Sequence, residues 1–293
     1  MDQGYIKTNI DKQKINSSDA LVAYLDILGY SELIKISEYA NICYGAIDAA
    51  LYRWNQYLET HKYNVGEAVK RHVKLQIMSD TFIVVLNQQA ILFDEGSDDS
   101  ALRYNILMIF LALISFLVQD SMRQIRRLFR GAIVRGKHYQ QRYENLEGST
   151  FIFSEALCDA YGLEQGIANM PRILIDKSIL SMLRKSEIDL LCKENRPDRE
   201  LIRDSDGFHY LNIYTSIVNN TALASILRET ASIVKSNLKK QYPPDIIRKY
   251  VWFANYHNKF VLHVIRSNAP ASIPCFNEIK GMQQEMLIEI PNL

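Results

Sequence analysis

Two hydrophobic segments of this chain each contain one aspartate at the point where the segment meets a turn. Asp26 lies in residues 22–30 (VAYLDILGY), and Asp80 lies in residues 75–85 (LQIMSDTFIVV). Runs of aliphatic and β-branched residues predict buried strands, where a carboxylate without a partner is costly. Each aspartate therefore needs a partner cation or a metal. Two such carboxylates together are suited to hold divalent cations over a triphosphate.

The order of the predicted elements defines the fold class. Gly29 ends the first strand, and only Ser79 and Asp80 separate the next two, which is the length of a tight hairpin. The order β-α-β-β-α-β predicts an α/β (α+β) fold, a ferredoxin-like sheet covered by helices. In chain order, the elements are predicted over residues 21–28 (strand), 31–58 (helix), 71–78 and 81–87 (strands), 101–124 (helix) and 128–134 (strand).

The character of the sequence changes after about residue 180. Before that point, Gly136 opens a basic polar loop that is predicted to end near Gly148. We divide the chain into residues 18–180, which hold the sheet, and residues 181–293, a C-terminal strand and helical extension packed on it. Pro270, Pro274 and Pro291 predict an irregular tail. Further elements are predicted over residues 151–165 (a short strand start and a helix), 172–176 and 208–213 (strands), and 221–240 and 243–265 (helices).

Charge, cysteine spacing and hydropathy argue against several classes of protein. A net charge of +1 over 293 residues gives no nucleic-acid signature. The four cysteines form no Cys-x-x-Cys pair and residues 1–7 do not resemble a secretory leader, which together predict reduced thiols in a cytoplasmic protein. The apolar residues 106–118 fall short of the roughly 20 needed to cross a membrane, so we expect a buried helix and no membrane association.

Three short motifs carry a resemblance to a known family. Residues 24–30 (YLDILGY), 78–82 (MSDTF) and 130–136 (RGAIVRG) resemble, in this order, the first strand, the hairpin and a later strand of class III nucleotidyl cyclases. Each motif alone is weak, because a short hydrophobic run with one Asp recurs by chance. The resemblance covers roughly residues 18–176 and implies that this region adopts the cyclase fold.

The resemblance implies a two-metal site. In it, Asp26 and Asp80 would bind two Mg²⁺ or Mn²⁺ ions, and Ile27 would add its backbone carbonyl. One ion would lower the pKa of the ribose 3′-hydroxyl, and the other would draw charge onto the leaving pyrophosphate. The turn formed by Leu28, Gly29 and Tyr30 would offer backbone N–H groups to the phosphates. Family members build each active site between two subunits, so a homodimer with composite sites is implied.

The sequence also departs from the family. Residues 153–164 (FSEALCDAYGLE) match a helix that in the family carries an Asn and an Arg, and Cys158 and Gly162 stand in their places. The lost Arg would steady the charge on the α-phosphate, so turnover requires another cation. We take Arg130 and Arg135 as catalytic candidates. The nearest segment offers four cations in all: Arg130, Arg135, Lys137 and Arg142.

The positions that read the base differ from both purine patterns of the family. Gln76 and Phe151 stand there, one with a hydrogen-bond donor and acceptor and the other with a stacking face. This pair points to a pyrimidine, UTP or CTP, without choosing between them. Together with residues 250–258 (YVWFANYHN), the motifs resemble the bacterial pyrimidine cyclases of Pycsar anti-phage systems, which make cyclic UMP or cyclic CMP as a second messenger.

Other interpretations of the same residues stay open. Asp26 and Asp80 also suit a helix cap and a turn, Gln76 an exposed strand position, and Phe151 a hydrophobic core. The arginines at 123, 126, 127 and 130 suit either a solvated helix end or a nucleic-acid stripe. Aromatic residues over 250–260 have the spacing of core packing. At the level of function, the alternative to a cyclase is a catalytically inactive cyclase-like module that binds nucleotides or a regulatory partner.

Overall fold

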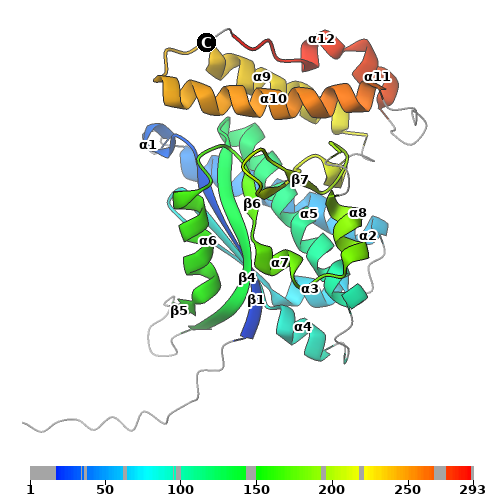
Figure 1. Ribbon diagram of the computed structural model, residues 1–293. Coiled ribbons are helices and arrows are strands. Elements are labelled where there is room, and N and C mark those ends of the chain that lie inside the picture. Colours follow the sequence, from blue (N-terminus) through cyan, green and yellow to red (C-terminus); the bar gives the residue numbers. More distant parts are fainter. Residues whose placement is uncertain are drawn as a thin grey trace, which may run out of the picture.

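The structure is a computed structural model that describes residues 18–291 except for 34, 36–37, 62–64, 95, 97–99, 143–149, 193–195, 218–220 and 267–274. Its body is an eight-stranded mixed sheet with helices on both faces, and two long helices lie across one end of the sheet (Figure 1). Residues 143–148 of the loop that is predicted to end near Gly148, and also Pro270 and Pro274, lie outside the described residues.

Four strands form the ferredoxin-like core that the sequence predicts. They pair in the order β2-β3-β1-β4, and every neighbouring pair is antiparallel. Helices α2 (Tyr39–His61) and α5 (Ser100–Ile125) make the two crossovers. This is the β-α-β-β-α-β arrangement, so the expected fold class is confirmed. The strands are β1 (Ser18–Ile27), β2 (Val73–Met78), β3 (Thr81–Leu86) and β4 (Phe129–Arg142).

Strand β1 lies at the centre of this core and determines where Asp26 lies. Leu21, Ala23 and Leu25 belong to the larger hydrophobic cluster, together with residues of α2 and α5. Val22 and Tyr24 belong to the smaller cluster, on the side of α6 (Glu155–Gly166). Because side chains alternate along a strand, Asp26 faces the same side as Val22 and Tyr24.

Helix α5 is the buried helix that the sequence predicts. By length and composition alone it could cross a membrane, but 67% of its most apolar 18-residue window is buried inside the fold. Its residues 106–118 are buried with the exception of Met108, which is half-buried. The helix packs against α2 and other helices, so its apolar surface is accounted for by contacts within the chain. The other helices are α3 (Gly66–His72), α4 (Gln88–Asp94), α9 (Leu223–Leu238) and the 3₁₀ helix η2 (Thr215–Ile217).

The sheet extends further than the sequence predicts. Strand β4 continues to Arg142 where a loop was expected after Gly136, and it forms a hairpin with β5 (Thr150–Ser154). Polar residues dominate this extension, so it lacks the hydrophobic alternation that marks a strand. On the other side of β4, the strands predicted over 172–176 and 208–213 are present: β6 (Ile173–Ile175) runs parallel to β4, and β8 (His209–Leu211) pairs with β6. Strand β7 (Leu201–Arg203), which the sequence does not predict, pairs with β8 and completes the sheet.

Several helices also differ from the prediction. The stretch expected over 31–58 is divided into α1 (Tyr30–Leu33) and α2, and the tail contains short helices in place of an irregular chain. The short helices α1, α11 (Phe276–Gly281) and α12 (Gln283–Met286) have too few residues for a clear 3.6-residue pattern. Two further helices are α7 (Lys177–Leu180) and α8 (Lys185–Cys192).

The two long C-terminal helices, α9 (Leu223–Leu238) and α10 (Pro244–Arg266), form a layer across the end of the sheet at which α1 lies (Figure 1). The aromatic residues of α10 pack inward as predicted, with Phe253, Tyr256 and Phe260 buried. His257 is fully buried between the Tyr214 hydroxyl (2.7 Å) and the Met286 carbonyl (3.0 Å), and burial lowers its pKa to about 4. The division of the chain at residue 180 stays a prediction.

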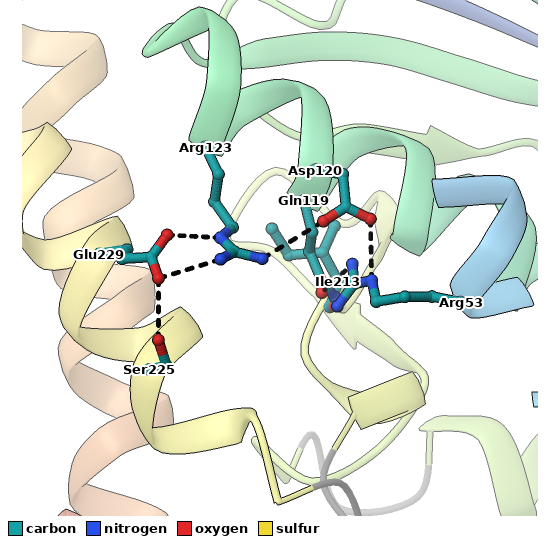
Figure 2. Close-up of polar contacts among 7 residues, drawn as sticks. All are labelled: Arg53, Gln119, Asp120, Arg123, Ile213, Ser225 and Glu229. Carbon is teal, nitrogen blue, oxygen red and sulfur yellow. Dashed lines mark hydrogen bonds and ion pairs between the residues drawn. The ribbon is translucent and has the colours of Figure 1, made fainter. Parts of the chain in front are cut away.

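A polar network fastens this layer to the body (Figure 2). The Arg123 guanidinium of α5 donates to both carboxylate oxygens of Glu229 on α9, at 2.6 and 2.9 Å, and also approaches Asp120 at 3.4 Å. Asp120 is buried and pairs with Arg53 of α2 at 2.8 Å. Gln119 donates to the Ile213 carbonyl. Arg123 therefore forms ion pairs within the chain, and this use of its charge argues against a place in a nucleic-acid-binding stripe.

Gly131 offers a test of the central pairing. A Cβ at this position would collide with the Tyr24 carbonyl oxygen across the β1–β4 pair. We expect Gly131→Ala to lower the free energy of unfolding by roughly 1–3 kcal/mol, the usual cost of overpacking. Gly162→Ala is the matched control, because Gly162 lies within α6 and its Cβ would meet no atom within 4 Å. It should gain roughly 0.5–1 kcal/mol. Urea unfolding measures both, and a Gly131→Ala protein as stable as the parent would contradict the packing.

Candidate active site

Asp26 and Asp80 lie at the same end of the sheet. Asp26 is the penultimate residue of β1 and stands opposite Thr81 on β3 and Arg130 on β4. Asp80 lies in the two-residue turn between β2 and β3, and its carbonyl accepts a hydrogen bond from the Ile27 N–H at 3.1 Å. Burial raises the pKa of Asp26, Arg130 opposes the shift, and the negative charge of Asp80 adds to it. The two carboxylates are thus close enough to interact.

Arg130 bridges two acids. Its Nε lies 3.0 Å from Asp26 Oδ2 and 2.6 Å from Glu164 Oε1. Glu164 is on α6 and is fully buried, and this burial raises its pKa despite the neighbouring guanidinium. Sequence reasoning did not select Glu164. Its only signal was its position at the end of the matched segment, residues 153–164.

Aromatic side chains and one lysine complete the surroundings. The Tyr24 hydroxyl lies 3.3 Å from Thr81 Oγ1, and the Tyr24 ring meets the Tyr161 ring edge-on at 5.5 Å between centroids. Lys249 approaches from α10, close enough to interact electrostatically with Arg130, Asp26 and Glu164. The site therefore combines residues of the sheet, of α6 and of the C-terminal layer.

The donor set fits Mg²⁺ or Mn²⁺ that is shared with a substrate. Mg²⁺ in phosphate-transfer sites takes one or two carboxylates and completes its shell with waters and phosphate oxygens. Asp26 and Asp80 supply two carboxylates, and Arg130 hydrogen-bonds only Oδ2 of Asp26. Among the described residues, no group of three or more His, Cys, Asp or Glu could hold a metal by itself. Phosphate oxygens would therefore be needed as further ligands.

The turn after β1 differs from the expectation in one respect. The Leu28 N–H donates to the Leu128 carbonyl at 3.0 Å, so it is already used within the fold and is not offered to phosphates. Gly29 has a φ of 78°, the left-handed conformation that glycine adopts without strain. Tyr30 begins the four-residue helix α1, and its ring packs edge-on against Tyr39 at 5.4 Å.

The base-reading candidates lie apart in the sheet. Gln76 is half-buried on β2, and Phe151 is on β5, with β3, β1 and β4 between them in the strand order. Phe151 is 43% exposed and touches the Tyr139 ring at 6.0 Å, so the core interpretation of this residue is wrong. Whether Gln76 and Phe151 read a base stays a prediction.

The structure separates the cation candidates. Arg135 pairs with Asp19 at 2.6 Å, near the start of β1 and therefore at the opposite end of the strand from Asp26. Lys137 also pairs with Asp19, at 3.1 Å. Neither is brought to Asp26 within the chain, whereas Arg130 is. The residues at the family's Asn and Arg positions give no replacement, because Cys158 is exposed and Gly162 faces open space.

Comparison with known proteins gives similarity to solved structures alone. No protein-family model and no curated protein matches the sequence. The guanylyl cyclase Cya2 is 9% identical, with a TM-score of 0.38 over 67% of this chain and 92% of that one. The guanylyl cyclase domain of the RhoGC fusion protein from the aquatic fungus Blastocladiella emersonii is 10% identical, with a TM-score of 0.39 over 66% and 93%. A bacterial light-regulated adenylyl cyclase is 9% identical, with a TM-score of 0.35 over 83% and 57%. We infer function from the site residues and not from these similarities.

The raised pKa of Glu164 predicts a pH dependence of stability. A carboxyl group whose pKa is higher in the folded state than in the unfolded state stabilises the fold fully at pH values below its unfolded-state pKa, near 4.5. This stabilisation is lost as the pH rises through the folded-state pKa. Glu164→Gln removes this titration. We therefore expect the unfolding free energy of the parent, relative to Glu164→Gln, to fall as the pH is raised from about 4.5, measured by urea unfolding across pH. A relative stability that rises with pH would show that Arg130 outweighs burial.

Proposed function

We propose that this protein is a nucleotidyl cyclase that converts UTP or CTP to the 3′,5′-cyclic monophosphate and pyrophosphate. One observation carries the proposal. Asp26 and Asp80 are brought together at one end of a ferredoxin-like sheet, with the Arg130 guanidinium held 3.0 Å from Asp26. Two interacting carboxylates next to a fixed cation suit a reaction in which negative charge shifts between phosphate oxygens.

Asp26, Asp80 and the Ile27 carbonyl are the groups that would hold Mg²⁺ or Mn²⁺. Bound divalent ions would neutralise phosphate charge and make the ribose 3′-hydroxyl more acidic. In the reaction, the 3′-oxygen forms a bond to the α-phosphorus and loses its proton. The bond from the α-phosphorus to the oxygen shared with the β-phosphate breaks, and pyrophosphate leaves.

Arg130 is our candidate for the cation that replaces the family arginine. It is the only one of Arg130, Arg135 and Lys137 that the described structure places beside Asp26. Glu164 holds it from a second side at 2.6 Å, so the guanidinium keeps a fixed partner if the Asp26 carboxylate turns towards another ligand. A cation fixed in advance stabilises developing charge without reorganisation.

Exposed apolar side chains support the proposal of a dimer with composite sites. Met78 next to the Asp80 turn is 58% exposed, Phe153 is 67% exposed and Tyr161 is 49% exposed. Exposed apolar residues of this size are a common feature of protein interfaces. We propose that these faces meet in a homodimer, where Gln76 and Phe151 of one chain select the pyrimidine beside Asp26 of the other.

The resemblance to Pycsar cyclases gives the proposed biological role, synthesis of a second messenger in cytoplasmic anti-phage defence. The second candidate function is an inactive module that binds nucleotide without turnover. The observation in its favour is the open space at Gly162, where the family's arginine would lie.

A product assay distinguishes the two functions. Purified protein is incubated separately with ATP, GTP, CTP and UTP plus Mn²⁺, and product masses are measured. We expect cyclic UMP or cyclic CMP alone. Asp26→Asn should lower kcat/KM by about 100-fold or more through loss of a metal ligand. Asp159→Asn removes the same charge from an exposed position on α6 and should leave the rate unchanged. A cyclic purine product would reject the role of Gln76 and Phe151, and no product would favour the inactive module.

Mixed dimers test the composite site. A dimer of one Asp26→Ala chain and one Gln76→Ala chain should regain up to about half of the parent activity, because one of its two sites is intact under two-fold symmetry. Since Arg130 and Asp26 meet within one chain, a dimer of Asp26→Ala with Arg130→Ala should stay inactive. Recovery in the second dimer, or none in the first, would contradict this assignment of residues to chains.

A further inference from the structure

A cavity of about 120 Å³ lies between the C-terminal layer and the end of β1. Three separate segments form its wall: the turn after β1, the turn between α5 and β4, and the first half of α10 together with Tyr242 just before it. On the same measure a single water needs only about 10–15 Å³, so the cavity can hold a larger group. Its lining residues are Leu28, Gly29, Arg127, Tyr242, Ile246, Lys249 and Tyr250.

The wall of this cavity is cationic. Arg127 and Lys249 line it, and no carboxylate does. Within the described part of the chain Lys249 forms no ion pair, whereas its neighbour Arg248 pairs with Asp245 at 2.5 Å. Lys249 is half-buried. It lies close enough to interact electrostatically with four charged residues: Arg130, Asp26, Glu164 and Asp245. A partly desolvated ammonium group without a paired anion favours binding of an anion.

The shape of the turn permits an anion to approach. Gly29 is left-handed, and even a Cβ at this position would stay 3.5 Å from Arg127 Nε. The Tyr242 and Tyr250 rings, which also line the cavity, stack at 6.2 Å between centroids. The cavity is therefore lined by cationic and aromatic side chains, and it lies next to the end of β1 that carries Asp26.

We propose that this cavity binds the polyphosphate part of a nucleoside triphosphate, and that Arg127 and Lys249 are its binding residues. The inference rests on the proposed function for the nucleoside, but the polyphosphate itself is recognised by charge alone. In this arrangement, the C-terminal helix α10 supplies part of the substrate site from the same chain as Asp26. Helix α10 then belongs to the active site in addition to packing on the body of the protein.

The test uses inorganic tripolyphosphate as the probe and isothermal titration calorimetry as the measurement. Lys249→Ala should weaken tripolyphosphate binding by about tenfold or more, as expected for the loss of one charge-assisted contact. Arg248→Ala removes the same charge from the adjacent, exposed position of α10 and should stay within about twofold of the parent, as a screened surface charge does. Lys249→Arg should restore most of the binding. Unchanged affinity in Lys249→Ala would overturn the proposal.

A second measurement covers the case in which Lys249→Ala fails to fold. Lysines of the parent protein are acetylated with and without tripolyphosphate, and the modified peptides are quantified by mass spectrometry. Lys249 should be protected, while Lys259, exposed on the same helix, should not. Equal modification of Lys249 in both samples would overturn the proposal.

The two proposals fail separately. Cyclic nucleotide production together with unchanged KM and unchanged tripolyphosphate affinity in Lys249→Ala would reject the cavity and retain the cyclase. Loss of tripolyphosphate binding in Lys249→Ala without any cyclic product in the parent would retain the cavity and reject the cyclase. A nucleoside monophosphate that binds as tightly as the triphosphate would show that the base and sugar, and not the polyphosphate, occupy the site.

Discussion

The Arg130 guanidinium, held between Asp26 and Glu164, is the interaction on which the arrangement of this end of the molecule depends. It requires β1 and β4 to pair in the register that places Asp26 opposite Arg130. It also requires α6 to lie close enough to the sheet for Glu164 to reach across. Ala156 and Ala160 on α6 are fully buried, and such small side chains allow this close approach of helix and strand. The β1–β4 register, the position of α6 and the geometry of the site therefore depend on one another.

The cost of burying these charges explains why they lie at the edge of the core. A fully buried carboxylate such as Glu164 is tolerated when a cation is within contact distance, and Arg130 supplies it. Asp26 is partly exposed, which leaves it able to exchange one partner for another. The structure thus keeps one acid fixed and one acid accessible around the same arginine. This difference supports the separate roles that we propose, with Glu164 holding Arg130 and Asp26 holding a metal.

The sequence predicts the central sheet well because its strands alternate or are continuously apolar, and because two residues between strands specify a hairpin. It fails for the outer half of β4, where Lys137, Tyr139 and Gln141 give no hydrophobic pattern and only pairing with β5 defines the strand. Local motifs select Asp26, Asp80 and Arg130, and the structure brings these three residues to the same end of the sheet. Lys249 could not be found in this way, since it is brought to Gly29 by packing between segments more than two hundred residues apart.

That separation along the chain has a consequence for protein synthesis. The strands around Asp26 pair with partners that leave the ribosome early, so they can assemble on a nascent chain. Helix α10 emerges much later, and only then does the wall that contains Lys249 close over the turn at Gly29. A ribosome-bound chain that already carries both aspartates consequently lacks its cationic cavity until the segment around Lys249 has also emerged.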